Sequence, residues 1–260
     1  MRKLSLIFML MVFILSGCFN TVNEDSDEYR ALSSQFDSFV SHDIIDVDQF
    51  EAFVNKATFE SIMSNVMIKV LIYDSFHKIA EVRYGSGVIF AVGAYNYVMT
   101  TFDLTNNPLN DMVSYQVTDY QGRTSNAIID VVSEEYELAV LRFVRVLSNR
   151  LPAVDFASQD SLIGEPVMLF GYIGEVMNSM SMGLVEDSNP NDVTLDRYMH
   201  TSIPSDLNAN GSAIININNE LLGIQIGIQD GFSYAVSISD ILNFLKIYSD
   251  YHKLDWLRKT

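Results

Sequence analysis

The sequence has a single cysteine and few basic residues, and both shortages exclude classes of protein. Cys18 is the one cysteine among 260 residues, so no disulfide can form within the chain. Lysine and arginine total 16 against 33 aspartates and glutamates, which gives a net charge of −17 at pH 7. A surface with this charge repels phosphate backbones. We therefore expect no nucleic-acid partner.

The N-terminal apolar run is too short to span a membrane. It covers residues 4–15 after Arg2 and Lys3, whereas a transmembrane helix needs roughly 20 apolar residues. Basic residues, an apolar run and then small residues are typical of a secretory signal. Residues 15–18, Leu-Ser-Gly-Cys, resemble the lipobox of bacterial lipoproteins, in which the cysteine is acylated and becomes the new N-terminus. The pattern predicts a signal peptide over residues 1–17, a lipid anchor on Cys18 and an extracytoplasmic location at the bacterial cell membrane.

After residue 18 the composition and apolar spacing of the sequence change twice. Residues 18–45 are polar and acidic, which suits a tether, and residues 46–63 have the apolar spacing of a short amphipathic helix. From about residue 66, short apolar segments alternate with Gly, Asn and Asp turns, which favours an all-β barrel or sandwich over βαβ units. Near the end, Ser239 is a candidate N-cap for a C-terminal helix with apolar positions over residues 241–248.

Several segments follow one another in the order of a known family. They are GSGVIF (residues 85–90), YVMTTFDL (97–104), the stretch over residues 117–143 with its Asp-x-x-Gly-Arg hairpin, GEPVMLFGYIG (164–174) and the following SMGLVE. Together they resemble the HtrA-type branch of the trypsin-like serine peptidases, and the resemblance covers about residues 66–246. It implies a domain over residues 46–260 that contains two six-stranded β-barrels, at about 66–150 and 151–236, and a closing helix. No PDZ-like domain is expected after it.

The resemblance also assigns the three positions of the catalytic triad, and all three are changed. Asp103 stands where the family has its histidine base, Glu137 where it has aspartate, and Asn210 where it has the serine nucleophile. An asparagine amide has no ionisable hydroxyl and cannot form an acyl-enzyme. An aspartate, with a reference pKa of about 3.9, is a poor base near neutral pH. The substitutions therefore predict a site that does not hydrolyse peptides.

Two other interpretations of this site remain open. A shift in register would bring Ser212 to the nucleophile position, but it would also break the match of the strand that follows. Three oxygen-bearing side chains in one cleft would suit a hard cation such as calcium. Because no metal-binding spacing is present, we expect a degenerate site with neither metal nor cofactor.

Peptide binding does not need the triad. The family holds its substrates largely through main-chain hydrogen bonds to the strand after the nucleophile loop, here residues 223–229, and this mode is β-augmentation. Asn208 takes an oxyanion-hole position, and Gly223, Gln225 and Gly227 lie in the strand, so we expect these four residues to contact a peptide. The sequence thus predicts a lipid-anchored pseudoprotease that binds polypeptide or a protein partner. The alternatives are an active serine endopeptidase that uses Ser212, and a structural envelope lipoprotein. The oligomeric state is left open.

Overall fold

The computed structural model describes residues 61–107, 112–145, 150–173, 176–186, 197–205, 209–229 and 231–252. The predicted signal peptide, Cys18 and the acidic tether lie outside the described residues, as does most of the helix predicted over residues 46–63. Its last residues are described, and residues 61–64 are helical. Within the described part of the chain, no helix is both long enough and apolar enough to cross a membrane.

The first barrel is a closed antiparallel sheet with the strand order β1-β2-β3-β6-β5-β4. Its strands are β1 (Asn65–Tyr73), β2 (Ile79–Val92), β3 (Tyr95–Thr101), β4 (Met112–Thr118), β5 (Thr124–Ser133) and β6 (Leu138–Phe143). Along β1, Ile68, Val70 and Ile72 recur at every second position and belong to the core of this barrel. The expected Asp-x-x-Gly-Arg hairpin joins β4 to β5. Asp119 Oδ1 accepts hydrogen bonds from the backbone N–H groups of Gln121 (2.9 Å) and Arg123 (3.0 Å).

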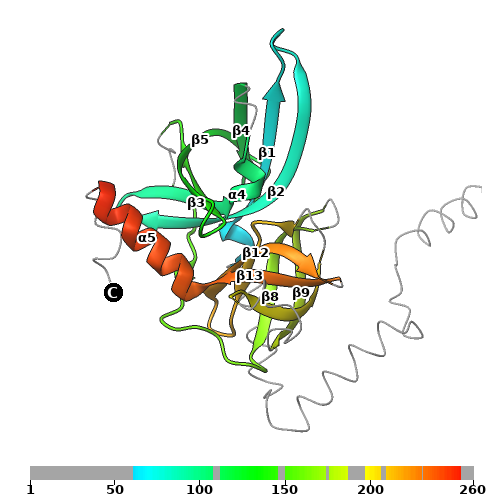
Figure 1. Cartoon of the computed structure of the whole chain (residues 1–260), viewed down its shortest axis with the longest axis vertical. Coiled ribbons are helices and arrows are strands. Elements are labelled where there is room, and N and C mark those ends of the chain that lie inside the picture. Colours follow the sequence, from blue (N-terminus) through cyan, green and yellow to red (C-terminus); the bar gives the residue numbers. More distant parts are fainter. Residues whose placement is uncertain are drawn as a thin grey trace, which may run out of the picture. The chain divides into compact units, whose positions relative to one another are not determined.

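The second barrel is closed in the same way by six strands. They are β8 (Pro166–Ile173), β9 (Val176–Glu186), β10 (Met199–Pro204), β11 (Ala213–Ile215), β12 (Glu220–Gln229) and β13 (Phe232–Ser237). The order is β11-β8-β9-β10-β13-β12, and pairing of β11 with β12 closes the ring. A two-residue strand, β7 (Asp155–Phe156), pairs parallel to the start of β12. The predicted all-β fold of two six-stranded barrels is confirmed (Figure 1).

The last described element is, as predicted, a helix, α5 (Ile238–His252). Its buried face contains Ile241, Phe244 and Leu245. The Tyr248 hydroxyl donates a hydrogen bond of 2.6 Å to Asp130 Oδ2 on β5, which ties the helix to the first barrel. The predicted cap was wrong. The helix begins one residue before Ser239, and Ser237 Oγ accepts the N–H of Asp240 at 3.5 Å.

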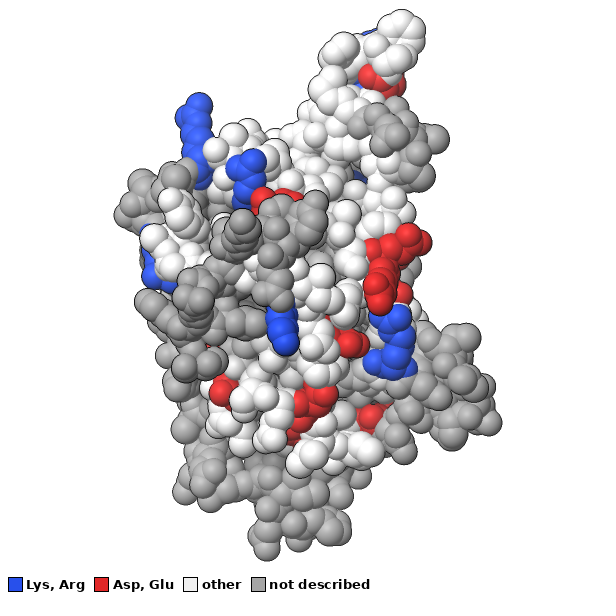
Figure 2. Space-filling view, turned by 60° about the vertical axis from the view of Figure 1, so that its left-hand side comes forward, with Lys and Arg blue, Asp and Glu red and all other residues white. Residues whose placement is uncertain are grey.

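The hairpin of β1 and β2 extends beyond the first barrel. β2 has 14 residues, but it pairs with β3 only from Val88 onward. Before that residue its described partner strand is β1 alone. We call residues 69–84 of this hairpin the arm. In Figure 1 the arm rises above the barrel, and in Figure 2 the same projection presents mostly uncharged surface.

Candidate functional site

Ser86, in the middle of β2, joins the two barrels. Its N–H donates to the carbonyl of Asn210 (2.8 Å), in the loop before β11, and its Oγ accepts the N–H of Tyr172 (2.8 Å) on β8. Its carbonyl accepts the hydroxyl of Thr100 (2.7 Å) on β3. The side chain is fully buried. One residue of the first barrel therefore fixes both the nucleophile-equivalent loop and a strand of the second.

Two glycines allow β8 and the loop before β11 to approach Ser86 closely. A Cβ atom on Gly171 would lie 1.8 Å from Ser212 Oγ and 2.7 Å from Ser86 Oγ. A Cβ atom on Gly211 would lie 2.0 Å from the carbonyl oxygen of Ser86, and Gly211 has a φ of +90°, which disfavours other residues. The junction therefore requires glycine at both positions.

Asp103 lies on a one-turn helix, α4 (Phe102–Thr105), that begins where β3 ends. Thr101 caps this helix, because its Oγ1 accepts the N–H of Leu104 at 3.4 Å. The Asp103 side chain is exposed. The preceding residue, Phe102, donates its N–H to the carbonyl of Glu137 at 2.9 Å, so the positions predicted for the triad base and acid lie close together.

Glu137 ends the turn before β6 with a φ of +55°, a conformation uncommon for a residue with a side chain. Its Oε1 accepts a hydrogen bond of 2.5 Å from the hydroxyl of Tyr198, just before β10. Burial raises the pKa of Tyr198 well above its usual value, and the hydrogen bond and charge of Glu137 raise this pKa further. The Glu137 carboxylate, at the position predicted for the triad acid, therefore binds a phenol.

Asn210, the residue predicted at the nucleophile position, has no nucleophilic side chain. Its carbonyl oxygen is bonded to Ser86, and its side-chain Oδ1 is buried with no hydrogen-bond partner among the described residues. Gly85 lies close to both Asn210 and Leu104 of α4, since a Cβ atom on this glycine would lie 3.2 Å from the Asn210 carbonyl oxygen and 2.7 Å from Leu104 Cδ2. Asn210 and α4 thus lie together, while no side-chain hydrogen bond joins Asp103, Glu137 and Asn210 in the part of the chain described.

Ser212, the alternative nucleophile, packs inside the second barrel. Its side chain is fully buried, and its Oγ lies against Gly171 without a hydrogen-bond partner among the described residues. Its N–H donates to the carbonyl of Ala209 (2.8 Å), and its carbonyl accepts the N–H of Gln225 (3.0 Å). In this position a substrate cannot reach the hydroxyl.

The structure describes three of the four residues expected to contact a peptide. Gly223 pairs with Ile214 of β11 on one side and Ser237 of β13 on the other. Gln225 donates its N–H to Ser212 and accepts the N–H of Gly211 at 2.8 Å. The main-chain groups of Gly223 and Gln225 are therefore used within the domain, and the contact of these residues with a peptide stays a prediction. Asn208 lies outside the described residues.

A bulge redirects the remainder of β12. The pairing of β12 with β13 shifts between Gln225 and Gly227, after which Gly227 pairs with Tyr234. The carbonyl of Ser233 faces β10, because it accepts the hydroxyl of Thr201 at 3.2 Å. The main-chain N–H and C=O of its neighbour Tyr234 consequently face β12. The main-chain groups of Gly227 therefore face β13, and those of Ile228 face the other edge of β12. On that edge the described residues supply no partner strand for Ile228, a residue that sequence reasoning missed.

Tyrosines fill the space between β12 and the acidic pair. A Cβ atom on Gly227 would lie 2.2 Å from the hydroxyl oxygen of Tyr234, so this glycine leaves room for the phenol. The Tyr234 ring lies 5.7 Å from that of Tyr198 and 6.2 Å from that of His200. Burial raises the pKa of Tyr234, and the charges of Glu137 and Asp103 add to this rise. No motif in the sequence pointed to Tyr198 or Tyr234, because only the folded chain brings them to Glu137.

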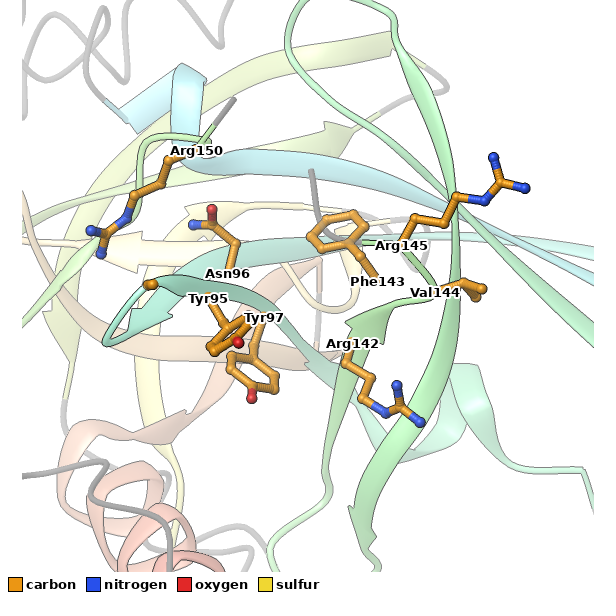
Figure 3. Close-up of a pocket in the computed structure, with 9 residues that line it drawn as sticks. Tyr95, Asn96, Tyr97, Arg142, Phe143, Val144, Arg145 and Arg150 are labelled. Carbon is orange, nitrogen blue, oxygen red and sulfur yellow. The ribbon is translucent and has the colours of Figure 1, made fainter. Parts of the chain in front are cut away.

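A separate pocket lies at the opposite ends of β3 and β6. It has a volume of about 300 Å³ and is lined by Ala94, Tyr95, Asn96, Tyr97, Arg142, Phe143, Val144, Arg145 and Arg150. Figure 3 shows that the three guanidinium groups point in different directions, so they do not converge on one ligand. Across the described residues, no group of three or more His, Cys, Asp or Glu side chains could hold a metal ion.

Comparison with known proteins agrees with this architecture. A family model described as a trypsin-like peptidase domain matches residues 85–224, a range that includes Asp103, Glu137 and Asn210. The crystal structure of the serine endoprotease from Yersinia pestis is similar in fold, with a TM-score of 0.60 and 20% sequence identity. The alignment covers 74% of this chain and 65% of that one, so it spans just under two thirds of that protein's length. No curated protein matches the chain.

Replacing Tyr198 with phenylalanine tests the bond to Glu137. Because the folded-state pKa of Tyr198 is raised, the stability that this group contributes is complete below its unfolded pKa of about 10 and is lost as the pH rises above it. Tyr198→Phe should lower the unfolding free energy at pH 7 by about 1–3 kcal/mol and make its decline above pH 10 shallower. Denaturant titrations at several pH values measure both effects.

Tyr95→Phe is the matched control, because Tyr95 is 58% exposed. It should change neither the stability at pH 7 nor the slope above pH 10. A Tyr198→Phe protein that behaves like this control would show that the bond to Glu137 contributes nothing.

Proposed function

This chain belongs to the trypsin-like peptidase domain family, and we propose that it is a member that binds polypeptide without hydrolysing it. The observation that carries the proposal is the state of the three triad-equivalent residues. Asn210 occupies the nucleophile position, and the Glu137 carboxylate is engaged by Tyr198. Acyl transfer needs a nucleophile and a base within hydrogen-bonding reach of each other. None of the side chains at the three positions can act as the nucleophile or as the base.

The packing of Ser212 argues against the active alternative. A serine nucleophile must reach the scissile carbonyl and have a base to take its proton. Ser212 Oγ is buried against Gly171, and the contacts of the described residues bring no imidazole to it. A register that used Ser212 would also break the pairing of its carbonyl with Gln225.

Hydrolysis is therefore expected to be absent. The full chain should not label with a fluorophosphonate, and unfolded casein incubated with it should stay intact, while an active trypsin-like enzyme treated in parallel labels and cleaves. Labelling that disappears in Ser212→Ala but persists in Ser75→Ala, a change at an exposed turn serine, would establish the active alternative in place of this proposal.

The edge of β12 at Ile228 supports polypeptide binding. Its N–H and C=O face an edge on which the described residues place no strand, so an extended chain can add there by β-augmentation. Tyr234 fills the space over Gly227, which leaves little room for a bulky peptide side chain at that point. Binding would therefore rest mainly on main-chain hydrogen bonds and depend weakly on peptide sequence.

Ile228→Pro tests this edge. Proline removes an N–H that has no partner among the described residues, so the fold should persist while affinity for unfolded casein falls at least tenfold. Fluorescence anisotropy measures the binding, and circular dichroism checks the fold. Ile217→Pro is the matched control, because Ile217 is half exposed and occupies the second position of the turn Asn216–Asn219, which favours proline.

The casein-binding results distinguish polypeptide binding at this edge from a purely structural role. Equal casein binding by the folded Ile228→Pro protein and its control would contradict binding at this edge. If the unmodified chain captures no casein at all, the structural envelope role is the one that remains.

The proposal also places the domain outside the cytoplasm, held to the bacterial cell membrane by lipid on Cys18. The support for this anchor is the sequence pattern of residues 1–18. Stable attachment takes two or more acyl chains, because one chain gives only marginal binding. The acidic stretch over residues 18–45 would then serve as the tether between the lipid and the domain.

A further inference from the structure

A second hollow adjoins the pocket at the ends of β3 and β6. The hollow has a volume of about 440 Å³ and is lined by Thr124, Ser125, Asn126, Val144 and Arg145. Val144 and Arg145 also line the pocket of about 300 Å³. We call the pocket and the hollow together the arginine groove. It extends from the start of β3 across the end of β6 to the start of β5.

The arginine groove differs in charge from the chain as a whole. Acidic residues outnumber basic ones by 33 to 16 in the sequence, yet the lining of the groove contains Arg142, Arg145 and Arg150 and no aspartate or glutamate. At physiological ionic strength, charges more than about 8 Å apart are largely screened. A ligand in the groove therefore interacts mainly with these arginines, and the groove favours an anionic ligand.

Two of the three arginines have no partner in the described part of the chain. Arg142 is already paired, because its Nε lies 3.2 Å from Asp130 Oδ1. Arg145 and Arg150 are exposed and form no hydrogen bond or ion pair with any described residue. Their charges are therefore available to a ligand.

Hydrogen bonds fix the backbone beside both of these arginines. The side chain of Asn96 binds Leu151, the residue after Arg150, through two bonds of 3.1 Å: its Nδ2 donates to the carbonyl, and its Oδ1 accepts the N–H. Val144, the residue before Arg145, donates its N–H to a carbonyl of β5 at 3.0 Å. A ligand thus meets two guanidinium groups whose backbone is already in place, which lowers the entropic cost of binding.

The arrangement of the groove suits an extended chain. The guanidinium groups diverge, so a single compact anion cannot contact them together (Figure 3). Carboxylates spaced along a chain can meet them one at a time. In the sheet order β3-β6-β5, neighbouring strands lie about 4.8 Å apart, so roughly three residues of extended chain cross the groove. Acidic side chains at every second position of such a chain face the groove together.

Exposed apolar side chains in the groove favour a peptide over an inorganic polyanion. Tyr95 is 58% exposed and Val144 is 53% exposed, and both line the groove. A peptide can cover them with apolar side chains and so remove apolar surface from water. A phosphate chain has no apolar group that could do this.

We propose that the arginine groove binds a short acidic peptide segment of a partner protein. The carboxylates of the segment bind Arg145 and Arg150, and its apolar side chains cover Tyr95 and Val144. Charge complementarity at the groove selects the partner. The interaction does not rest on the edge of β12, because the groove belongs to the first barrel and β12 to the second.

A labelled peptide tests the groove directly. The full chain in mild detergent is titrated into fluorescein-labelled Glu-Leu-Glu-Ala-Glu-Leu-Glu at about 0.15 M salt, and fluorescence anisotropy measures the affinity. Arg145→Glu and Arg150→Glu replace attraction with repulsion, so each should weaken binding at least threefold and the double variant at least tenfold. The same peptide with glutamine in place of glutamate should bind the unmodified chain at least tenfold more weakly.

Lys78→Glu is the matched control, because it makes the same change in net charge at an exposed residue of the arm. Lys78 precedes the first residue of β2, whereas Tyr95 in the groove pairs with the last, Val92. The control should change the affinity less than twofold. Circular dichroism checks the fold of every variant.

Tyr95→Ala separates a peptide site from a site for inorganic anions. It should weaken peptide binding at least threefold, because it removes apolar contact. Unchanged peptide affinity in Tyr95→Ala, together with complete displacement of the peptide by tripolyphosphate, would show an anion site and overturn the proposal. So would equal weakening by Lys78→Glu, full binding by the arginine variants, or no binding by the unmodified chain.

Discussion

One buried serine makes two of the hydrogen bonds that join the two barrels of this protein. Ser86 uses its N–H, its carbonyl and its hydroxyl to bind Asn210, Thr100 and Tyr172. A buried polar group that loses its partner costs more than the bond itself contributes, so the three contacts constrain one another. The loop before β11, the end of β3 and the end of β8 are all positioned by this residue.

The junction separates the scaffold of the family from its chemistry. Gly211 with its positive φ, the short helix α4 and the turn ending at Glu137 hold the loop and the two adjacent positions that an acyl-transfer site would use. The side chains at those positions make other contacts. Tyr198 engages the carboxylate of Glu137, and Tyr234 lies over Gly227 beside it. The hydrogen bonds of Ser86 and the close approach at Gly171 and Gly211 involve neither Asp103 nor Glu137.

Much of the fold could be predicted from the sequence, because the burial of alternate strand residues is a local pattern. The strands of both barrels and the closing helix were predicted in this way, while the cap of that helix was wrong by two residues. Ser237 and Ser239 are both good N-caps, and only the point at which β13 ends selects between them. The length of the arm beyond the barrel depends on where β3 stops pairing, which no local pattern specifies.

The site could be predicted only in part. Order along the chain predicts triad positions for Asp103, Glu137 and Asn210, because the segments around them resemble those of the family. The bulge before Gly227 could not be predicted, because it depends on how β12 pairs with β13, and it reverses which residues face outward after it. Tyr198 was missed because its contact with Glu137 joins residues 61 positions apart.

The measurement that tests this account most directly is the unfolding free energy of Ser86→Ala. The change removes the buried hydroxyl that accepts the hydrogen bond from the N–H of Tyr172, so denaturant titration should show a loss of about 1–3 kcal/mol. Ser75→Ala, in the exposed turn of the arm, should lie within about 0.5 kcal/mol of the unmodified chain. A Ser86→Ala protein as stable as this control would contradict the claim that Ser86 holds the two barrels together.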